Sequence, residues 1–318
     1  MKNLLKISMI VFVTLGIASC SNDDDSNPST ATNSIADFVA SNDDYSSLEA
    51  ALDKAGLTAT LAGAEDLTVF APNNAAFAAF LSANGFASLD DVPTDLLTNV
   101  LLNHVVGGKV LAADLTTGYI NSLATESTSG KNLSMYVNTA GGVNLNGVST
   151  VTTANIMADN GVIHAVNAVI GLPTVVTFAT ADPTFSTLVA ALTRDDQPDF
   201  VSVLSTPSGT SPSPFTVFAP TNEAFVSLLS DLGVGSLADI DGPTLTATLN
   251  THVIAAANVR SENLVNGPIN TLGAEIIVDA DSATLTDPNG RVSNIIVVDV
   301  QASNGVVHAI DMVLLPQL

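Results

Sequence analysis

The segment LTVFAPNNAAF at residues 67–77 recurs as FTVFAPTNEAF at residues 215–225. A second pair, NGVIHAVNAVIGLP at residues 160–173 and NGVVHAIDMVLLPQ at residues 304–317, follows in the same order. The chain is therefore two copies of one unit of about 140 residues, which is the size of an ordinary domain rather than of a solenoid repeat. Any function therefore belongs to a unit that is present as a tandem pair.

The sequence of each copy predicts helices and strands around this segment. Residues 67–72 predict a short β-strand that Pro72 stops, and Pro220 occupies the same place in the second copy. Asn73 or Asn74 is the expected N-cap of the helix that follows. Leucine and alanine at helical spacing predict helices before the strand, and residues 93–106 predict another after it.

A hairpin is predicted near the end of each copy. Asn160-Gly161 and Asn304-Gly305 each lie between β-branched runs. Asn-Gly tolerates the positive φ angles of a type I′ turn, so this turn is expected at both places. Helices that are segregated from an antiparallel, sandwich-like sheet indicate the α+β class.

The N-terminus predicts export. Two lysines precede an apolar run at residues 7–17, which is too short to cross roughly 30 Å of hydrocarbon and is typical of a signal peptide. The sequence IASC that ends at Cys20 resembles a bacterial lipobox, which implies a lipoprotein signal peptide at residues 1–19 and lipid attachment at Cys20. No other cysteine occurs in the 318 residues, so no disulfide can form within the chain.

Residues 20–33 are polar and acidic and lack core-forming side chains, so they predict a flexible tether. The acidic triplet at residues 23–25 resembles an export signal of bacterial surface lipoproteins, although a solubilising linker would look the same. We expect an outer membrane lipoprotein at the cell surface, with a periplasm-facing orientation left open. The membrane is then contacted through the lipid anchor only.

The net charge limits the kinds of partner that the protein can bind. The chain has 8 Lys and Arg against 31 Asp and Glu, a formal net charge of −23. Nucleic-acid affinity comes largely from Lys and Arg that displace counterions, so nucleic acid is excluded as a partner. Neutral glycans and extracellular proteins remain compatible with this charge, and Ca²⁺ that bridges carboxylates is left open as an aid to binding.

These motifs together resemble a known family. TVFAPTNEAF, the LLNHVVGG segment at residues 101–108 and NGVIHAVNAVIGLP are similar to the two signature regions and the central histidine region of the fasciclin domain. The resemblance covers two tandem domains, at residues 34–173 and 174–318. It implies that each is a wedge-shaped β-sandwich with a helical layer, of a kind found in secreted or surface-tethered adhesion proteins, and it implies no catalytic residue.

The four histidines occupy repeat positions, His104 with His252 and His164 with His308. No H-x-x-x-H spacing and no cysteine completes a zinc set, so neither a metal nor a cofactor is predicted. Each histidine follows or interrupts an apolar run. We expect hydrogen-bonded core residues, which belong with Pro72, Pro220, Gly161 and Gly305 to the structural motifs of the fold.

Other functional motifs are incomplete. A G-x-S-x-G elbow is missing from the sequence, and GVGSLA at residues 233–238 follows a helical pattern rather than the strand that a dinucleotide site needs. Acidic pairs do not complete an EF-hand loop, so solvated turns are expected at Asp43/Asp44, Asp90/Asp91, Asp195/Asp196, Asp239/Asp241 and Asp279/Asp281.

The family resemblance also implies an adhesion motif. In animal members of the family, adhesion is partly attributed to an Asp-Ile pair just before the final hairpin. The matching positions read Asn155-Ile156 and Asp299-Val300, so neither copy keeps both residues.

The sequence predicts a surface-tethered, non-catalytic lipoprotein that mediates adhesion or binds glycan or matrix. Two linked copies raise avidity if both engage one surface. The alternative is a receptor for a small molecule, which a pocket between helices and sheet would favour. An uncharacterised enzyme ranks below both, because no polar constellation is visible in either copy. The binding residues themselves are not predicted.

Overall fold

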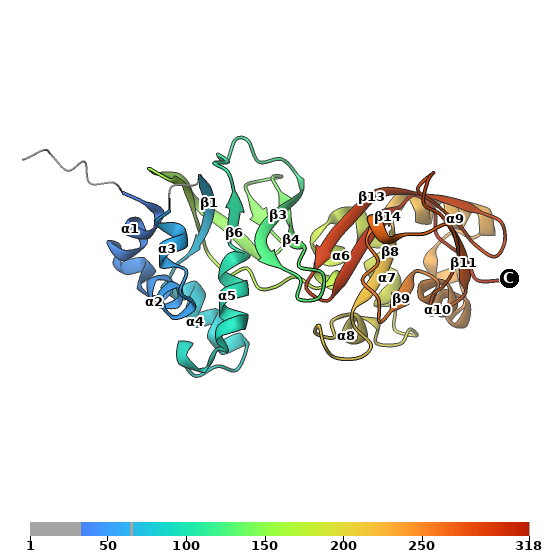
Figure 1. The fold of residues 1–318 in the computed structure, drawn as a ribbon. Coiled ribbons are helices and arrows are strands. Elements are labelled where there is room, and N and C mark those ends of the chain that lie inside the picture. The colour runs from blue at the N-terminus through green and yellow to red at the C-terminus, as the bar shows by residue number, and fades with distance from the viewer. Residues whose placement is uncertain (1–32, 64–65, 318) are drawn as a thin grey trace, which may run out of the picture. The chain divides into compact units, whose positions relative to one another are not determined.

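The computed structural model describes residues 33–63 and 66–317 (Figure 1). Asn33–Leu318 form one compact unit. The predicted signal peptide at residues 1–19, the predicted lipid attachment at Cys20 and all but the last residue of the predicted tether therefore lie outside the described residues.

The first copy alternates helices with strands in its N-terminal half and is mainly β afterwards. Its helices are α1 (Ile35–Ala40), η1 (Asp43–Tyr45), α2 (Ser46–Ala55), α3 (Thr58–Leu61), α4 (Asn74–Ala83), η2 (Leu89–Asp91) and α5 (Thr94–Leu102). Its strands are β1 (Leu67–Pro72), β2 (Val105–Gly107), β3 (Gly118–Thr125), β4 (Asn132–Asn138), β5 (Asn144–Leu145), β6 (Ser149–Ala158) and β7 (Gly161–Val166).

The second copy repeats this order. Its helices are α6 (Val175–Ala181), η3 (Pro183–Phe185), α7 (Ser186–Leu192), α8 (Phe200–Leu204), α9 (Asn222–Leu232), η4 (Leu237–Asp239), α10 (Gly242–Asn250) and η5 (Ser261–Asn263). Its strands are β8 (Phe215–Pro220), β9 (Val253–Ala255), β10 (Gly267–Asn270), β11 (Glu275–Asp279), β12 (Thr284–Thr286), β13 (Val292–Ala302) and β14 (Gly305–Ile310).

Side-chain caps set where the helices begin. Asn73 caps α4 by accepting from the N–H of Ala76, and Thr221 caps α9 in the same way. Ser34 and Thr174 form capping boxes at α1 and α6, which satisfy N–H groups that a first helical turn leaves unpaired. The matching positions thus keep the capping chemistry while the residue type changes.

The helix predicted at residues 93–106 is shorter than expected. It is α5, which ends at Leu102, and Val105 belongs instead to β2. The N–H of Phe70 donates to the His104 carbonyl, and Val105 pairs with Val69. The helical pattern extended past the true end because the same residues are buried whether they form a helix turn or a strand.

Each copy forms a seven-stranded sheet in the described residues, in the orders β2-β1-β7-β6-β5-β4-β3 and β10-β11-β12-β13-β14-β8-β9. Most pairings are antiparallel, as predicted. The prediction is wrong at the centre of each sheet, where β1 pairs with β7 and β8 with β14 in parallel. All six residues of each of these four strands are buried, because side chains cover both faces.

The two faces of each sheet belong to separate apolar clusters. Val69 and Ala71 of β1 pack with the helices, whereas Phe70 between them packs with β4 and β5. In the second copy Val217 and Ala219 face the helices and Phe218 joins the other cluster. This alternation follows from the two-residue period of a strand and gives the helical layer and the sandwich that the α+β prediction described.

The hairpins form, but their turns differ from the predicted type I′. Ala158 pairs with Gly161, so the turn residues are Asp159 and Asn160 rather than Asn160 and Gly161. Neither turn residue has a positive φ angle. Gly161 itself has φ +153°, and a Cβ there would collide with the Leu67 carbonyl. Close approach of two backbones, and not the turn, requires this glycine.

The side chain of Asn160 connects the hairpin turn to the helices. Its Oδ1 accepts from the N–H of Ile35 at 2.9 Å, and its Nδ2 donates to the carbonyls of Leu61 and Gly63 at 2.7 and 2.8 Å. This buried amide thus joins the hairpin to α1 and to the end of α3. Asn304 makes the three matching bonds, to Val175, Leu204 and Thr206.

No single helix in the described ranges is long and apolar enough to cross a membrane; one bent pair, Val175–Ala181 with Pro183–Leu192, passes that test only in combination.

Candidate functional site

The histidines use both ring nitrogens within the fold. His104 Nδ1 lies 2.8 Å from the Val100 carbonyl, and its Nε2 accepts from the N–H of Ile170 at 2.8 Å. A carbonyl can only accept and an amide N–H can only donate, so these partners fix a neutral ring that is protonated on Nδ1. His252 repeats the arrangement with the Thr248 carbonyl and the N–H of Leu314.

The other histidine pair has the opposite tautomer. His164 Nε2 donates to the Val110 carbonyl at 2.9 Å, and its Nδ1 accepts from the N–H of Asn155 at 3.2 Å. His308 makes the matching bonds to Val259 and Asp299. Phe70 and Phe218 stack on these two rings at centroid distances of 5.5 and 5.7 Å. The four rings bind main chain and leave no lone pair for a metal ion.

Burial lowers the pKa of His104 and His252 to about 4. It also lowers the pKa of His164 and His308, against the opposing effect of their carbonyl partners. Protonation would charge each ring in an apolar interior and oblige the accepting nitrogen to donate toward an N–H group. The rings are therefore neutral at physiological pH.

The Asp-Ile positions lie in the sheets, where Val300 is buried, Ile156 and Asp299 are half-buried and Asn155 is exposed. Asn155 and Asp299 both have φ +61°, at irregularities in the pairing of β6 with β7 and of β13 with β14. Asn and Asp tolerate this left-handed conformation better than other residues with a Cβ. Asp299 accepts from the N–H and the hydroxyl of Ser261 at 2.7 and 2.6 Å, and Val300 is buried.

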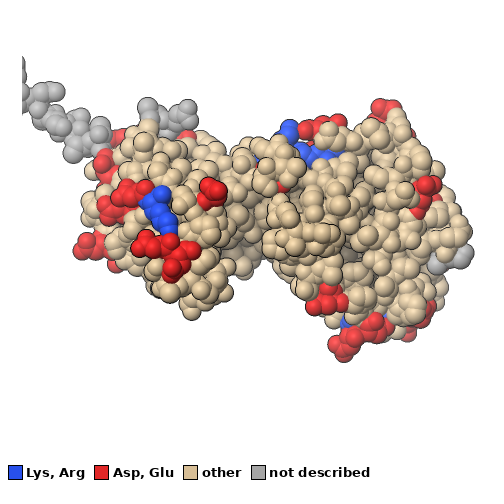
Figure 2. All heavy atoms as spheres, turned by 60° about the horizontal axis from the view of Figure 1, so that its bottom comes forward, with Lys and Arg blue, Asp and Glu red and all other residues tan. Residues whose placement is uncertain are grey.

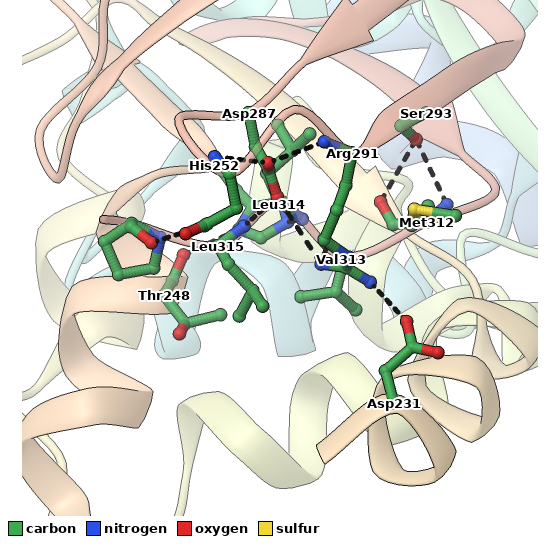
Figure 3. A network of polar contacts seen from close by, with 12 residues as sticks. Asp231, Thr248, His252, Asp287, Arg291, Ser293, Met312, Val313, Leu314 and Leu315 are labelled. Atoms are coloured by element: carbon green, nitrogen blue, oxygen red, sulfur yellow. Dashed lines mark hydrogen bonds and ion pairs between the residues drawn. The ribbon is translucent and has the colours of Figure 1, made fainter. Parts of the chain in front are cut away.

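The second domain contains a polar network that sequence reasoning missed (Figure 3). The fully buried carboxylate of Asp287 accepts from the N–H of Leu315 at 3.0 Å and pairs with Arg291 Nη1 at 3.4 Å. Arg291 also donates to the Val313 carbonyl at 2.8 Å and to Asp231 at 2.9 Å. These contacts hold residues 313–315 against the sheet.

The first domain secures the matching segment without charges. Asn103 Nδ2 donates to the Gly171 carbonyl at 3.0 Å, and its Oδ1 accepts from the Ser122 hydroxyl at 2.9 Å. Thr251 replaces this asparagine in the second copy. In the sequence, the only sign of the charged network is that Asp287 and Arg291 are four residues apart, a spacing that is also typical of an ordinary surface ion pair.

Residues of the two copies meet through polar contacts. Tyr119 donates to Asp182 at 2.9 Å, and the N–H of Gln301 donates to the Ser134 hydroxyl at 2.9 Å. Tyr136 packs in the core cluster of the second copy, and β4 contacts β13. Burial, followed by the charge of Asp182, raises the pKa of Tyr119, so this hydroxyl remains a donor.

A groove of about 630 Å³ lies beside these contacts. We call it the junction groove. Its lining comes from β3 and β4, from the loop after β9 and from β13, namely Gly118, Tyr119, Asn121, Lys131, Asn132, Ser134, Arg260, Val297, Val298, Asp299 and Val300. Polar and apolar atoms share the surface, which suits ligands that carry hydroxyl groups on a carbon framework.

The junction groove contains two cationic side chains, each of which is paired with a carboxylate. Acidic side chains are scattered over a mostly uncharged surface in Figure 2. Lys54 and Arg194 are engaged elsewhere, because they donate to main-chain carbonyls of their own domains. Lys131 and Arg260 line the groove, where they pair with Glu262 and Asp299 at 2.7 and 3.3 Å.

One donor in the groove has no hydrogen-bond partner among the described residues. It is Nε of Arg260, a buried atom that lies 3.9 Å from the carboxylate of Glu262. Its other nitrogens are engaged with Gln301 at 2.8 Å and with Asp299. An unpaired buried donor costs about 1–3 kcal/mol.

The acidic pairs do not converge. Asp91 and Asp239 complete capping boxes, and Asp241 caps α10. Asp196 pairs with Arg194, and Asp279 accepts from the N–H of Ser282. In the described part of the chain, no group of three or more His, Cys, Asp or Glu side chains is placed to hold a metal ion.

Comparison with known proteins places the chain in a family. The fasciclin domain model matches residues 43–173 and 183–316. Protein sll1483 of Synechocystis is 38% identical over 136 residues, which are 43% of this chain and 72% of that protein. Human periostin is 30% identical over 279 residues, which are 83% of this chain and 30% of periostin. Rabbit transforming growth factor-beta-induced protein ig-h3 is 29% identical over 260 residues, 78% of this chain and 34% of that protein.

This chain thus spans about a third of the length of ig-h3 and periostin. A solved structure of a FAS1 domain pair, from the insect cell adhesion molecule fasciclin I, covers 84% of this chain and 92% of its own, with a TM-score of 0.49 and 20% identity. The two family matches cover most of the sequence, in the order in which its motifs repeat. The chain therefore belongs to the fasciclin domain family and carries two such domains in tandem.

Proposed function

We propose that this protein is a non-catalytic adhesion lipoprotein, which Cys20 tethers at the outer surface of the cell and which binds a glycan or a matrix protein. Fasciclin domains are found in cell adhesion proteins, and this chain carries two of them. The observation that supports a ligand site is the junction groove, with the exposed amide of Asn121 in its lining.

The chemistry of the groove favours a neutral, hydroxyl-rich ligand. Lys131 and Arg260 are already matched by Glu262 and Asp299, so the groove has no surplus of charge to attract an anion. Asn121 is exposed and makes no side-chain hydrogen bond to another described residue. A sugar hydroxyl can exchange hydrogen bonds with this amide, while its ring carbons contact Val297 and Val298.

An array of glycans and matrix proteins, probed with and without Ca²⁺, tests the proposal. We expect saturable binding to at least one class. Asn121→Trp should fill the groove and abolish that binding, because the exposed side chain can be enlarged without opening a core. Val226→Trp is the matched control, since Val226 is 68% exposed on α9 and lies outside the groove.

The outcomes separate two parts of the proposal. Silence across all classes would contradict adhesion itself. Binding that Asn121→Trp leaves unchanged would retain adhesion but exclude the junction groove. A requirement for Ca²⁺ would show that carboxylates at the surface take part through a bridging ion.

A further inference from the structure

The second domain has an apolar cavity between its helices and its sheet. The cavity has a volume of about 40 Å³ and opens between α6, α7 and α8 above β8 and β14. Its floor includes Leu188, Val217, Ala219 and Val307, which are all at most 9% exposed. Thr180, Thr193 and Val201 are exposed at the mouth. The cavity is therefore accessible from solvent.

The first domain shows why the cavity exists. Ile35 and Val175 are equivalent, because each donates its N–H to the hairpin asparagine. Ile163 and Val307 are equivalent, because they pair with Val69 and Val217. The helix repeat also places Ala179 where the first domain has Val39.

These three positions lose four side-chain carbon atoms in the second domain. Val176 replaces Ala36 and restores bulk, but it is partly exposed at the rim. Protein interiors are normally close-packed, so the side-chain carbons lost at these positions account for the cavity in the second domain.

The cavity offers a ligand no free hydrogen-bond donor from a side chain. Its only polar side chains are Thr180 and Thr193. The Thr180 hydroxyl donates to the carbonyls of Val176 and Thr177, and the Thr193 hydroxyl donates to that of Val189. Water needs two to four polar partners to occupy a cavity, so this one favours hydrocarbon.

The shape and charge restrict the ligand further. A volume of 40 Å³ is well below the roughly 150 Å³ of a cavity that holds benzene, so it admits a narrow chain end rather than a ring. A net charge of −23 on the protein opposes an anionic head group at the mouth.

We propose that this cavity binds the end of an unbranched, uncharged aliphatic chain, such as the tail of a neutral lipid or of a long-chain alcohol. The site is separate from the junction groove and does not depend on adhesion. It gives the protein a receptor-like activity that is confined to the second domain.

Titration of the purified full chain with 1-hexanol and 1-octanol tests this site. We expect saturable binding with one site per chain and shifts of the methyl NMR signals of Ala179 and Val307. Hexanoate at neutral pH should bind at least tenfold more weakly than hexanol, because its carboxylate is charged.

Substitutions that restore the side chains of the first domain should close the site. Ala179→Val and Val307→Ile should each weaken binding at least tenfold, whereas Ala190→Val, on the exposed side of α7, should not change it. Circular dichroism checks that each variant is folded. If Ala179→Val does not fold, the test rests on Val307→Ile alone. Absence of saturable binding, equal binding of hexanoate, or binding that survives both substitutions would overturn the proposal.

Discussion

The N–H of Leu314 donates to Nε2 of His252 at 2.9 Å, and the N–H of Ile170 donates to His104 in the same way. Each bond joins the last segment of a domain to the second residue after α10 or α5. It can form only while the imidazole is neutral, because a protonated ring has no acceptor. The closure of both domains is therefore linked to pH.

We expect stability to fall as the pH decreases from about 6.5 toward 4. The pKa of His104 and His252 is about 4 in the folded protein and about 6.5 in the unfolded chain, so unfolding takes up protons in this window. The free energy of unfolding, summed over both domains, should be lower by about 4 kcal/mol at pH 5 than at pH 7.

Urea unfolding at several pH values measures this change. The lowered pKa of His164 and His308 acts in the same direction. NMR supplies an independent check on the folded protein, since the Hε1 signals of His104 and His252 should stay constant from pH 8 to pH 5. Signals that titrate near pH 6.5 would contradict the assigned tautomers.

Gly161→Ala and Gly305→Ala should each destabilise their domain by about 3 kcal/mol or more, because the new methyl group collides with the backbone of Leu67 or of Phe215. Gly171→Ala is the control. A Cβ at Gly171 would have no atom within 4 Å, and Gly171 does not have a φ angle in the left-handed region. The substitution should therefore change the free energy of unfolding by no more than about 1 kcal/mol. Equal effects at the three positions in thermal unfolding would refute the close-approach explanation.

Arg291→Met should cost the second domain about 3 kcal/mol, because it leaves the buried carboxylate of Asp287 without its cation. The loss should be smaller in the double variant with Asp287→Asn, where no buried charge remains. Lys131→Met removes a cation from a half-exposed pair and should cost less than about 1 kcal/mol. Chemical denaturation of the four proteins distinguishes a buried charge effect from a general loss of positive charge.

Cys20→Ala should move the protein from the membrane fraction to the soluble fraction of its host, because the proposed lipid is attached through this thiol. Fractionation followed by immunoblotting measures the distribution. Ser21→Ala serves as the neighbouring control and should leave the protein with the membranes. Retention of the Cys20→Ala variant there would rule out the lipid anchor.

The sequence alone determined the two-fold repeat, the fasciclin family and the α+β class, because these depend on local patterns that occur twice. It also placed the four histidines in the interior, since their apolar neighbours leave few alternatives. N-caps such as Asn73 could be predicted because their partners lie within one helical turn.

Only the tertiary structure decided which distant groups meet. The parallel pairing of β1 with β7 joins segments nearly a hundred residues apart, and it assigns Gly161 to a backbone contact rather than to a turn. The buried pairing of Asp287 with Arg291, the unpaired Nε of Arg260 and the cavity above Val307 likewise arise from packing. Hydrogen bonds and volumes between remote residues depend on three-dimensional proximity, of which periodicity along one chain carries no record.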